Sequence, residues 1–394
     1  MAPNIYCLLC RTSFPEQSFV KTYKIPIRHE CWNGPLSYVQ NSSYQRGVIH
    51  VAKPIIEQEI ATKLDAQHLA SISPNGLCIA DFGCSTGHNS FPAMQFIIQA
   101  IKQNLEYTKI PEFYVYFNDV VTNDFNTLFN LLPPDRLYRA AAMPGDFHGR
   151  LLPEYSLHFG YSSCSLHWLT EIPKAVADRD SLAWNKGEIL YTGDRKEVCE
   201  AYLEQYSRDI ESFLKSRAVE MVGGGLMALL VPAVPEFWNP EIEYTIPSDI
   251  NLMGSCLMDM AKKSWRKNRR GGSGPGITRL MGRFSEEKVD SFNIPFYFTT
   301  PQQLKAIMEK SHSFSIERTE ILNNPGKYTL PSVNARAAFF RAVHERLLTD
   351  HFGSEIIDEL FGHYMEKLAV SPVFLNPDND KSVVILVVLK RKID

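Results

Sequence analysis

Residues Leu77–Gly87, with the sequence LCIADFGCSTG, decide the fold of this chain. The stretch opens with the apolar run Leu77–Asp81, typical of a short buried strand, and continues into a turn that contains Gly83 and Gly87. The apolar residues of Phe91–Ile101 then recur at helical spacing. A strand, a glycine-rich turn and a helix form the opening unit of a doubly wound α/β sheet, so we predict that fold class.

Similar runs further along the chain predict more of this sheet. Amphipathic helices are expected at 43–64 and 196–221, and strands at Phe113–Phe117, Leu157–Tyr161, Leu226–Val231 and Val383–Leu389. We expect Gly223, Gly224 and Gly225 to end the second helix, as glycine commonly does. Strands that alternate with helices favour a mostly parallel sheet covered on both faces.

The rest of the sequence divides into a leader, a core and a cap. Residues 1–35 show no sustained period and are expected to be a loosely ordered leader. Residues 36–231 are predicted to form the first part of the α/β core, and 343–394 its last part. Between them, 232–342 are predicted to form a mainly helical cap with a flexible insertion near 264–283. We expect aromatic residues of the cap to wall the binding site, with Phe237, Trp238, Tyr297 and Phe298 as candidates.

Composition and charge argue against several classes of function. The chain has 394 residues, 44% of them hydrophobic, and a formal net charge of −3. That charge gives no electrostatic reason to expect a nucleic acid or an anionic membrane as partner. Apolar runs fall short of the roughly 18 residues of a membrane span, and the first residues lack the pattern of a secretory signal. We therefore expect a cytoplasmic protein that acts on a small molecule.

Two local patterns allow alternative interpretations. Cys7 and Cys10, with His29 and Cys31, could form a four-ligand zinc site. The single residue between His29 and Cys31 is atypical of zinc ligands, so an irregular extension is the preferred interpretation. The basic segment Lys262–Arg270 could contact a phosphate, but the glycine-rich residues after it favour a solvated insertion.

Acidic residues end two successive strands and point to a cationic cofactor. Asp81 stands in the first turn, where a dinucleotide fold of the NAD type has glycine. A carboxylate there repels a diphosphate but attracts the ammonium group of a methionine moiety. Asp119, at the end of the second strand, can accept hydrogen bonds from both ribose hydroxyls. The pair predicts S-adenosylmethionine (SAM), although either aspartate could be a structural turn residue.

A third group of polar residues follows the strand Leu157–Tyr161. Ligands of open α/β sheets bind at the carboxyl ends of the strands, so His167 and Trp168 are expected to face the crevice. Alternatively, Trp168 is a core residue and His167 a structural one.

Together these features resemble the plant SABATH methyltransferases, which methylate small carboxylic acids or xanthines. The resemblance covers 36–392 and rests on the motifs SYVQNSSYQ at 37–45, DFGCSTGHN at 81–89, FND at 117–119, PGDF at 144–147, SLHWL at 165–169 and DSFNIP at 290–295. It implies a Rossmann-like class I methyltransferase core, with a mostly parallel seven-stranded sheet and an α-helical cap, in a homodimer.

The matching positions imply residue roles. The SAM pocket would be lined by Tyr38, Ser42, Gln45, Asp81, Gly83, Cys84, Asn89, Asp119, Val120, Asp146, Phe147 and Ser163. The substrate would be bound by Gln45, Cys164, His167 and Trp168. Some members of the family hold a magnesium ion, structural at most here, at positions matching Asn185, Asp290, Phe292 and Asn293. The resemblance implies positioning residues only, with no catalytic acid or base.

Three departures from the family pattern affect these expectations. Asp146 replaces a serine near the adenosine, and desolvation of its carboxylate is expected to weaken SAM binding. Cys164 replaces a tyrosine beside the methyl group, which leaves a roomier and less polar wall. The segment 264–283 resembles an insertion, and 1–33 lack the family's glycine-rich start.

The expected reaction is methyl transfer from SAM to the carboxylate of a small aromatic, terpenoid or iridoid acid. Such an acid is already ionised at pH 7, so no general base is required. The alternatives are N-methylation of a xanthine-like ring and a non-catalytic acid-binding protein. An NAD-dependent dehydrogenase fits less well because the glycine turn has the wrong spacing.

Overall fold

The computed structural model describes residues 34, 37–73, 75–105, 110–191, 195–235, 245–270, 284–376, 378 and 380–393. The zinc candidates of the leader and the wall candidates Phe237 and Trp238 lie outside these residues. In the described parts, no helix combines the length and apolar character needed to cross a membrane.

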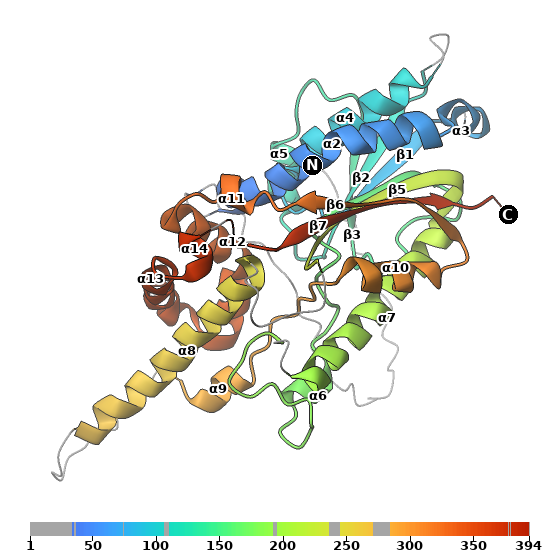
Figure 1. Ribbon diagram of the computed structural model, residues 1–394. Coiled ribbons are helices and arrows are strands. Elements are labelled where there is room, and N and C mark those ends of the chain that lie inside the picture. The colour runs from blue at the N-terminus through green and yellow to red at the C-terminus, as the bar shows by residue number, and fades with distance from the viewer. Residues whose placement is uncertain are drawn as a thin grey trace, which may run out of the picture.

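One seven-stranded sheet forms the centre of the described chain (Figure 1). Its order is β3-β2-β1-β4-β5-β7-β6, with the first five strands parallel and β7 antiparallel to both β5 and β6. The strands are β1 (Leu77–Phe82), β2 (Phe113–Asp119), β3 (Arg139–Pro144), β4 (Leu157–Ser163), β5 (Met221–Ala233), β6 (Phe314–Asn323) and β7 (Val383–Arg391). The predicted mostly parallel α/β sheet is confirmed.

Helices cover both faces of the sheet and gather at one end of it (Figure 1). On one face, α2 (Ser43–Lys63) packs with α4 (Ser90–Gln103), and on the other, α7 (Lys196–Glu220) packs with α10 (Pro301–Glu309). The cap at the end of the sheet contains α8 (Thr245–Arg270), α12 (Val333–Phe352) and α13 (Ile357–Leu368). The shorter helices are α1 (Tyr38–Asn41), α3 (Ala66–Ile72), α5 (Phe125–Asn130), α6 (Lys174–Ala177), α9 (Glu286–Asp290), α11 (Gly326–Thr329), η1 (Ser354–Ile356) and α14 (Pro372–Leu375).

The register of the parallel strands aligns the ends that carry the polar residues. Asp81 lies beside Phe117 of β2 and Tyr161 of β4. Asp119 and Ser163 each lie two residues beyond those partners, so all three polar residues reach the same edge of the sheet. This edge is the expected place for a ligand in an open α/β fold.

The predicted bounds of the long helix are confirmed to within one residue, but the prediction that the three glycines end it was wrong. Helix α7 ends at Glu220, and β5 begins at Met221, so the three glycines lie inside the strand. Gly224 has a φ of +82°, and the pairing of β5 with β4 is irregular between Leu157 and Phe159. Gly224 therefore provides the left-handed backbone of a strand irregularity rather than a helix cap.

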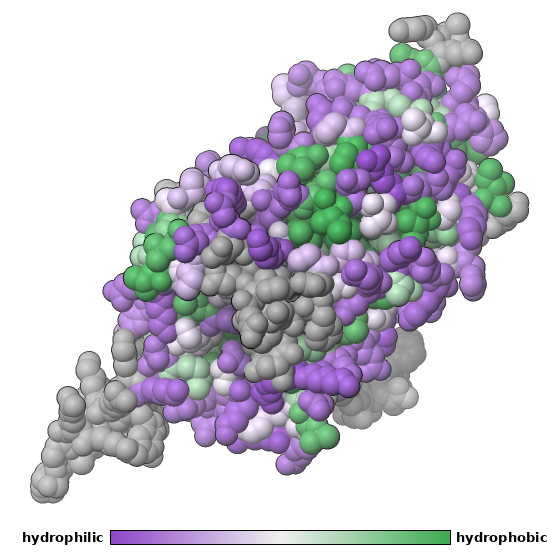
Figure 2. Space-filling model, in the orientation of Figure 1, coloured by the Kyte–Doolittle hydropathy of each residue, from purple (hydrophilic) through white to green (hydrophobic). Residues whose placement is uncertain are grey.

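Two strands were missed by the sequence analysis because their side chains do not form apolar runs. β3 is a partly exposed edge strand with the sequence RAAAMP. β6, at the opposite edge, carries the partly exposed Arg318, which donates to Glu320 of the same strand and to Glu59 of α2. Figure 2 shows apolar side chains gathered on the surface over β6, where Ile321 is 53% exposed. The stretch 232–342 therefore contributes a strand to the sheet as well as cap helices, and the domain boundaries at 231 and 342 remain predictions.

The predicted insertion near 264–283 is partly helical. Helix α8 continues to Arg270, and 271–283 lie outside the described residues.

A buried ion pair joins the cap helices α8 and α12. Arg336 Nε donates to Asp249 Oδ2 at 2.6 Å, and the two side chains are 6% and 3% exposed. Burial raises the pKa of Asp249 to about 6, although the charge of Arg336 opposes that shift.

We expect Arg336→Met alone to lower the free energy of unfolding by about 3–5 kcal/mol, because it leaves Asp249 buried beside no counter-ion. The double variant Arg336→Met/Asp249→Leu should recover most of this loss. Urea denaturation at pH 7.5 measures both, and a double variant less stable than Arg336→Met would contradict the expectation.

Candidate active site

The turn between β1 and α4 is fastened to both neighbouring strands. The backbone N–H groups of Gly83 and Cys84 donate to the carbonyl oxygen of Asn118, each at 2.9 Å. Ser165 Oγ, after β4, donates to the carbonyl of Gly83 at 3.2 Å. Gly83 has a φ of +88°, and a Cβ there would lie 2.0 Å from Ser165 Oγ. Only glycine fits this position. Through these hydrogen bonds the turn holds the ends of β1, β2 and β4 together.

Asp119 is buried with both carboxylate oxygens facing backbone donors. Its Oδ2 accepts from Ser85 N at 2.7 Å and its Oδ1 from Val120 N at 2.8 Å. Burial raises the pKa of Asp119 to about 6, although these two N–H groups oppose the shift. Each oxygen has a second lone pair, so the carboxylate can still accept the two hydroxyls of a ribose.

Asp81 is also buried, and one of its oxygens has no partner. The residue is 2% exposed, and Oδ2 has no hydrogen-bond partner among the described residues. Burial raises the pKa of Asp81 to about 7, and the charge of Asp119 adds to the shift. An ammonium group would satisfy this oxygen and offset the desolvation of the carboxylate.

Two adjoining cavities connect these aspartates with the cap. The larger has a volume of about 370 Å³ and includes Asp119 in its wall, whereas the smaller includes Asp81. Both are lined by Tyr38, Gln45, Gly83 and Ser163. The other predicted cofactor residues divide between them, with Val120, Asp146 and Phe147 at the larger cavity and Cys84 and Asn89 at the smaller.

Ser42 is the one predicted cofactor residue that lines neither cavity. It is fully buried, and its carbonyl oxygen accepts from Asn89 Nδ2 at 3.3 Å. It therefore positions Asn89 at the smaller cavity.

The four predicted substrate residues all line the larger cavity. Trp168 lies with its ring perpendicular to Phe296, at 4.0 Å between ring centres. Gln45 is 9% exposed, and its Oε1 has no partner among the described residues. Cys164 has a φ of +56°, and burial raises the pKa of its thiol to about 12, so the thiol stays protonated at neutral pH.

The substrate end of the larger cavity is lined by neutral groups. Burial lowers the pKa of His167 to about 3, and His344 adds to the shift, so its imidazole is uncharged at pH 7. No lysine or arginine occurs among the described residues that line either cavity. An anion bound here would be held by neutral donors.

A buried network supports the loop that carries Asp146 and Phe147. Arg217 is fully buried and donates to the carbonyl oxygens of Phe147 at 2.6 Å and Gly149 at 2.8 Å. Its Nε donates to Glu220 at 2.8 Å, and Glu220 accepts the N–H of Leu152 at 2.9 Å. This network fixes the loop from the side of α7.

Asp146 is less desolvated than the sequence suggested. Its side chain is 52% exposed, and Oδ1 lies 2.7 Å from His148 Nδ1 and accepts from His148 N at 3.0 Å. A half-exposed carboxylate with these partners carries a small desolvation cost, so the expected loss of SAM affinity has no support in this geometry.

The larger cavity also contains residues that the sequence analysis missed. Phe339, Val343 and His344 reach it from α12, Ile246 from α8 and Phe296 from the loop after α9. The other missed residues are Tyr44, Val121, Thr122, His148, Ser165, Leu169, Thr170 and Pro232. Tyr297 and Phe298, expected in the wall, do not line it, and Tyr297 packs on Tyr191 and Tyr206 instead. Helix α12 packs against α1 and α13. This packing decides the wall, and a helical period alone does not encode it.

Comparisons with known proteins agree with this geometry. The family model described as SAM dependent carboxyl methyltransferase matches residues 29–270 and 278–392. The chain belongs to the SABATH family of SAM-dependent carboxyl methyltransferases. It is 40% identical over 361 residues to loganic acid O-methyltransferase of Catharanthus roseus, covering 90% of this chain and 92% of that protein. It is also 36% identical over 336 residues to paraxanthine methyltransferase 2 of Arabidopsis thaliana, covering 83% and 88%.

A solved structure of loganic acid methyltransferase with S-adenosylhomocysteine (SAH) has the same architecture. It superposes on this SABATH methyltransferase with a TM-score of 0.83 at 40% identity, covering 92% of this chain and 98% of that chain. The class I methyltransferase fold and the use of SAM follow from these findings.

The predicted magnesium residues come together but do not form a magnesium site. Asn185 Nδ2 donates to Asn293 Oδ1 at 2.9 Å, which leaves Asn185 Oδ1 and Asn293 Nδ2 buried without a partner among the described residues. Asp290 supplies the only carboxylate of the set, and its Oδ1 accepts from Gly187 N at 2.8 Å. Phe292 packs on Phe352. Magnesium prefers octahedral oxygen ligands with carboxylates among them, so these four residues are better explained as structural.

The raised pKa values predict that SAM and SAH bind more tightly as pH rises. Below about pH 7 a cationic ligand must displace the proton of Asp81. We expect the Kd of SAH, measured by calorimetry from pH 5.5 to 7.5, to fall by up to roughly tenfold per unit below that pKa.

In the variant Asp81→Asn, the decrease in the Kd of SAH between pH 6 and 7.5 should disappear. At pH 7.5 this variant should bind SAH more weakly than the wild type does. The pH dependence of the Kd that is due to Asp119, whose pKa is about 6, should remain below pH 6. A profile in Asp81→Asn that matches the wild type would contradict this role.

Proposed function

We propose that this SAM-dependent methyltransferase forms the methyl ester of a small carboxylic acid. The observation that carries the proposal is the difference in charge between the two ends of the joined cavities. Asp81 and Asp119 suit a cationic cofactor at one end, whereas the Trp168 indole N–H is a neutral donor at the other and the Gln45 amide is a neutral donor where the two cavities meet. A carboxylate bound by such donors keeps its charge and its nucleophilicity.

The transfer is a direct displacement at the methyl group. A carboxylate oxygen of the acid bonds the methyl carbon while the carbon–sulfur bond breaks, and the sulfur keeps the electron pair as SAM becomes SAH. An acid with a pKa of about 4 to 5 is already ionised at pH 7, so no proton has to move. His167, with its pKa lowered to about 3, would be a poor base and is not needed as one.

The protein's contribution is positioning. Holding the oxygen, the methyl carbon and the sulfur in line supplies roughly 7–11 kcal/mol of the barrier reduction. Gln45 is placed for this because it lines both cavities and therefore lies where cofactor and acid meet. Cys164, beside Ser163 at the same junction, adds a small and weakly polar wall.

N-methylation of a xanthine-like ring is the second candidate, because the neutral imidazole of His167 suits an uncharged ring and a paraxanthine methyltransferase is among the relatives. Incubation with labelled SAM and a panel of carboxylic acids and xanthines separates the two. Label in a base-labile ester supports our proposal, and base-stable label on a purine nitrogen supports the alternative.

We expect Trp168→Phe and Gln45→Ala each to lower kcat by roughly tenfold or more, because each loses a hydrogen bond to a charged oxygen, worth about 1.5–3 kcal/mol. SAH affinity should stay within a few-fold of the wild type in Trp168→Phe. Single-turnover methylation and calorimetry measure the two effects.

Matched controls are available in the same chain. Trp184→Phe changes a tryptophan that lies outside the cavities and beneath the ammonium group of Lys186. Gln103→Ala changes an exposed residue at the end of α4. Both should retain wild-type turnover. Full turnover in Trp168→Phe and Gln45→Ala would refute the proposed substrate contacts.

A further inference from the structure

Arg217 of α7 holds two carbonyl oxygens of the loop that follows β3. Its Nη1 donates to the carbonyl of Phe147 at 2.6 Å, and its Nη2 donates to the carbonyl of Gly149 at 2.8 Å. The third guanidinium nitrogen, Nε, donates to Glu220 Oε2 at 2.8 Å. The side chain is fully buried, so every nitrogen of this guanidinium has a protein partner in place of water.

Two serines of the same helix hold the carbonyl oxygen that lies between those two. The carbonyl of His148 accepts from Ser212 Oγ at 3.0 Å and from Ser216 Oγ at 2.9 Å. Residues 146–149 form a turn, closed by a backbone hydrogen bond of 3.1 Å between its ends. Together with Arg217, the two serines therefore bind three successive carbonyl oxygens of this loop from α7, and we call the three side chains the carbonyl clamp.

The same turn forms part of the wall of the larger cavity. Residues 146–148 all line that cavity, whereas the smaller cavity around Asp81 is lined by other parts of the chain. The N–H of Gly145, just before the turn, donates to the carbonyl oxygen of Asp119 at 2.9 Å. The turn therefore lies beside the aspartate that suits a ribose, at the nucleoside end of the cofactor site.

Stability of the fold alone does not explain a buried arginine at this position. The guanidinium carbon of Arg217 lies 4.4 Å from the ring centre of Phe82 and 5.1 Å from that of Phe213. Apolar side chains of similar volume often replace a buried ion pair without loss of stability, because the desolvation of both charges is unfavourable. Apolar side chains cannot supply donors aimed at carbonyl oxygens, however. The clamp is therefore better explained by the conformation that it gives to the turn.

We propose that Arg217, together with Ser212 and Ser216, is a positioning residue for the nucleoside part of SAM. The clamp fixes the peptide orientations of the turn before the cofactor binds, so that binding does not have to order it. In a protein whose turn is less ordered, the Kd rises in inverse proportion to the fraction of molecules that are competent to bind. The proposal rests on the use of SAM and is independent of which acceptor is methylated.

Two ligands separate the ends of the cofactor site. SAH should occupy both ends, whereas 5′-methylthioadenosine has the ribose and the base but lacks the amino-acid part. Calorimetry on the full-length chain gives the Kd of each ligand. Arg217→Lys keeps the charge but loses the planar fork, and we expect it to weaken both ligands by the same factor of about tenfold. Asp81→Asn should weaken SAH but leave the Kd of methylthioadenosine near that of the wild type.

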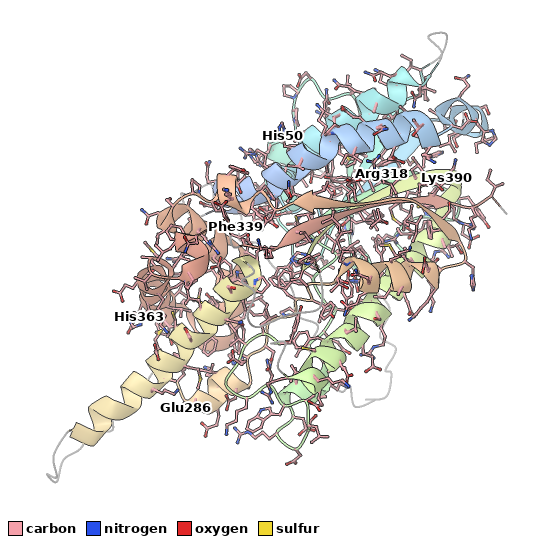
Figure 3. The ribbon with its side chains drawn as sticks, viewed as in Figure 1. His50, Glu286, Arg318, Phe339, His363 and Lys390 are labelled. Atoms are coloured by element: carbon pink, nitrogen blue, oxygen red, sulfur yellow. The ribbon has the colours of Figure 1, made fainter. Side chains whose placement is uncertain are left out.

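Arg318 allows the same substitution as a control. It also donates to two carboxylates, those of Glu59 and Glu320, but it lines neither cavity. Figure 3 shows Arg318 on β6, beside α2, whereas Arg217 belongs to α7 on the other face of the sheet. Arg318→Lys should keep the wild-type Kd for both ligands.

A milder variant carries the test if a thermal melt shows that Arg217→Lys is unfolded. Ser212→Ala/Ser216→Ala removes both donors to the carbonyl of His148 without leaving a charge unpaired. It should weaken both ligands by about three- to tenfold, as the loss of one net hydrogen bond allows. Ser207→Ala is its control on the same helix, because the hydroxyl of Ser207 donates to a carbonyl oxygen of α7 itself. This control should change neither Kd.

Amide hydrogen exchange shows whether the turn is the part that responds. Without ligand, peptides that cover 145–152 should exchange faster in the clamp variants than in the wild type. Addition of SAH should restore most of the wild-type protection, because bound cofactor orders the turn. Exchange in peptides of β5 and β7, at the centre of the sheet, should not change.

Three outcomes would overturn the inference. One is a lower melting temperature in the clamp variants with an unchanged Kd for both ligands, which would make the clamp a purely structural feature. Another is a loss of SAH affinity without a loss of methylthioadenosine affinity, which would place the effect outside the nucleoside end. The last is an equal loss of affinity in the control variants, which would show that the effect does not depend on the turn.

Discussion

The burial of two carboxylates at the ends of adjacent strands is the constraint on which the rest of the structure depends. The parallel register of β1 and β2 brings Asp81 and Asp119 to one edge of the sheet, and the turn at Gly83 keeps them there. Their raised pKa values show that each charge is unfavourable without a ligand. A cationic cofactor offsets that cost, which explains why the site binds a sulfonium compound rather than a diphosphate.

The opposite end of the cavity follows from the same electrostatics. With a cation bound between two acids, an anionic acceptor needs only neutral donors to hold it near the methyl group. An arginine would bind the acid more strongly but would reduce its nucleophilicity. In our proposal the cap selects the acid, because Phe296 and two residues of α12, Phe339 and His344, line the cavity.

The sequence predicted the cofactor half of the site well because that half is local. Asp81, Gly83 and Cys84 belong to one strand–turn–helix unit, and Asp119 ends the next strand, so the fold class alone brings them together. The substrate half was predicted only at Gln45 of α2 and at the loop after β4. Tyr297 was chosen and Phe296 missed, although they are neighbours, because neither composition nor period shows which of two adjacent aromatics faces a cavity. The strands β3 and β6 were missed for a similar reason, since edge strands with small or charged residues show no apolar run.

The most direct test of the central claim is a crystal structure of this chain with SAH bound. Our account predicts the ammonium group of SAH within hydrogen-bond distance of the Asp81 carboxylate and both ribose hydroxyls on Asp119. A ribose bound away from Asp119, or an ammonium group that leaves Asp81 without a partner, would contradict it.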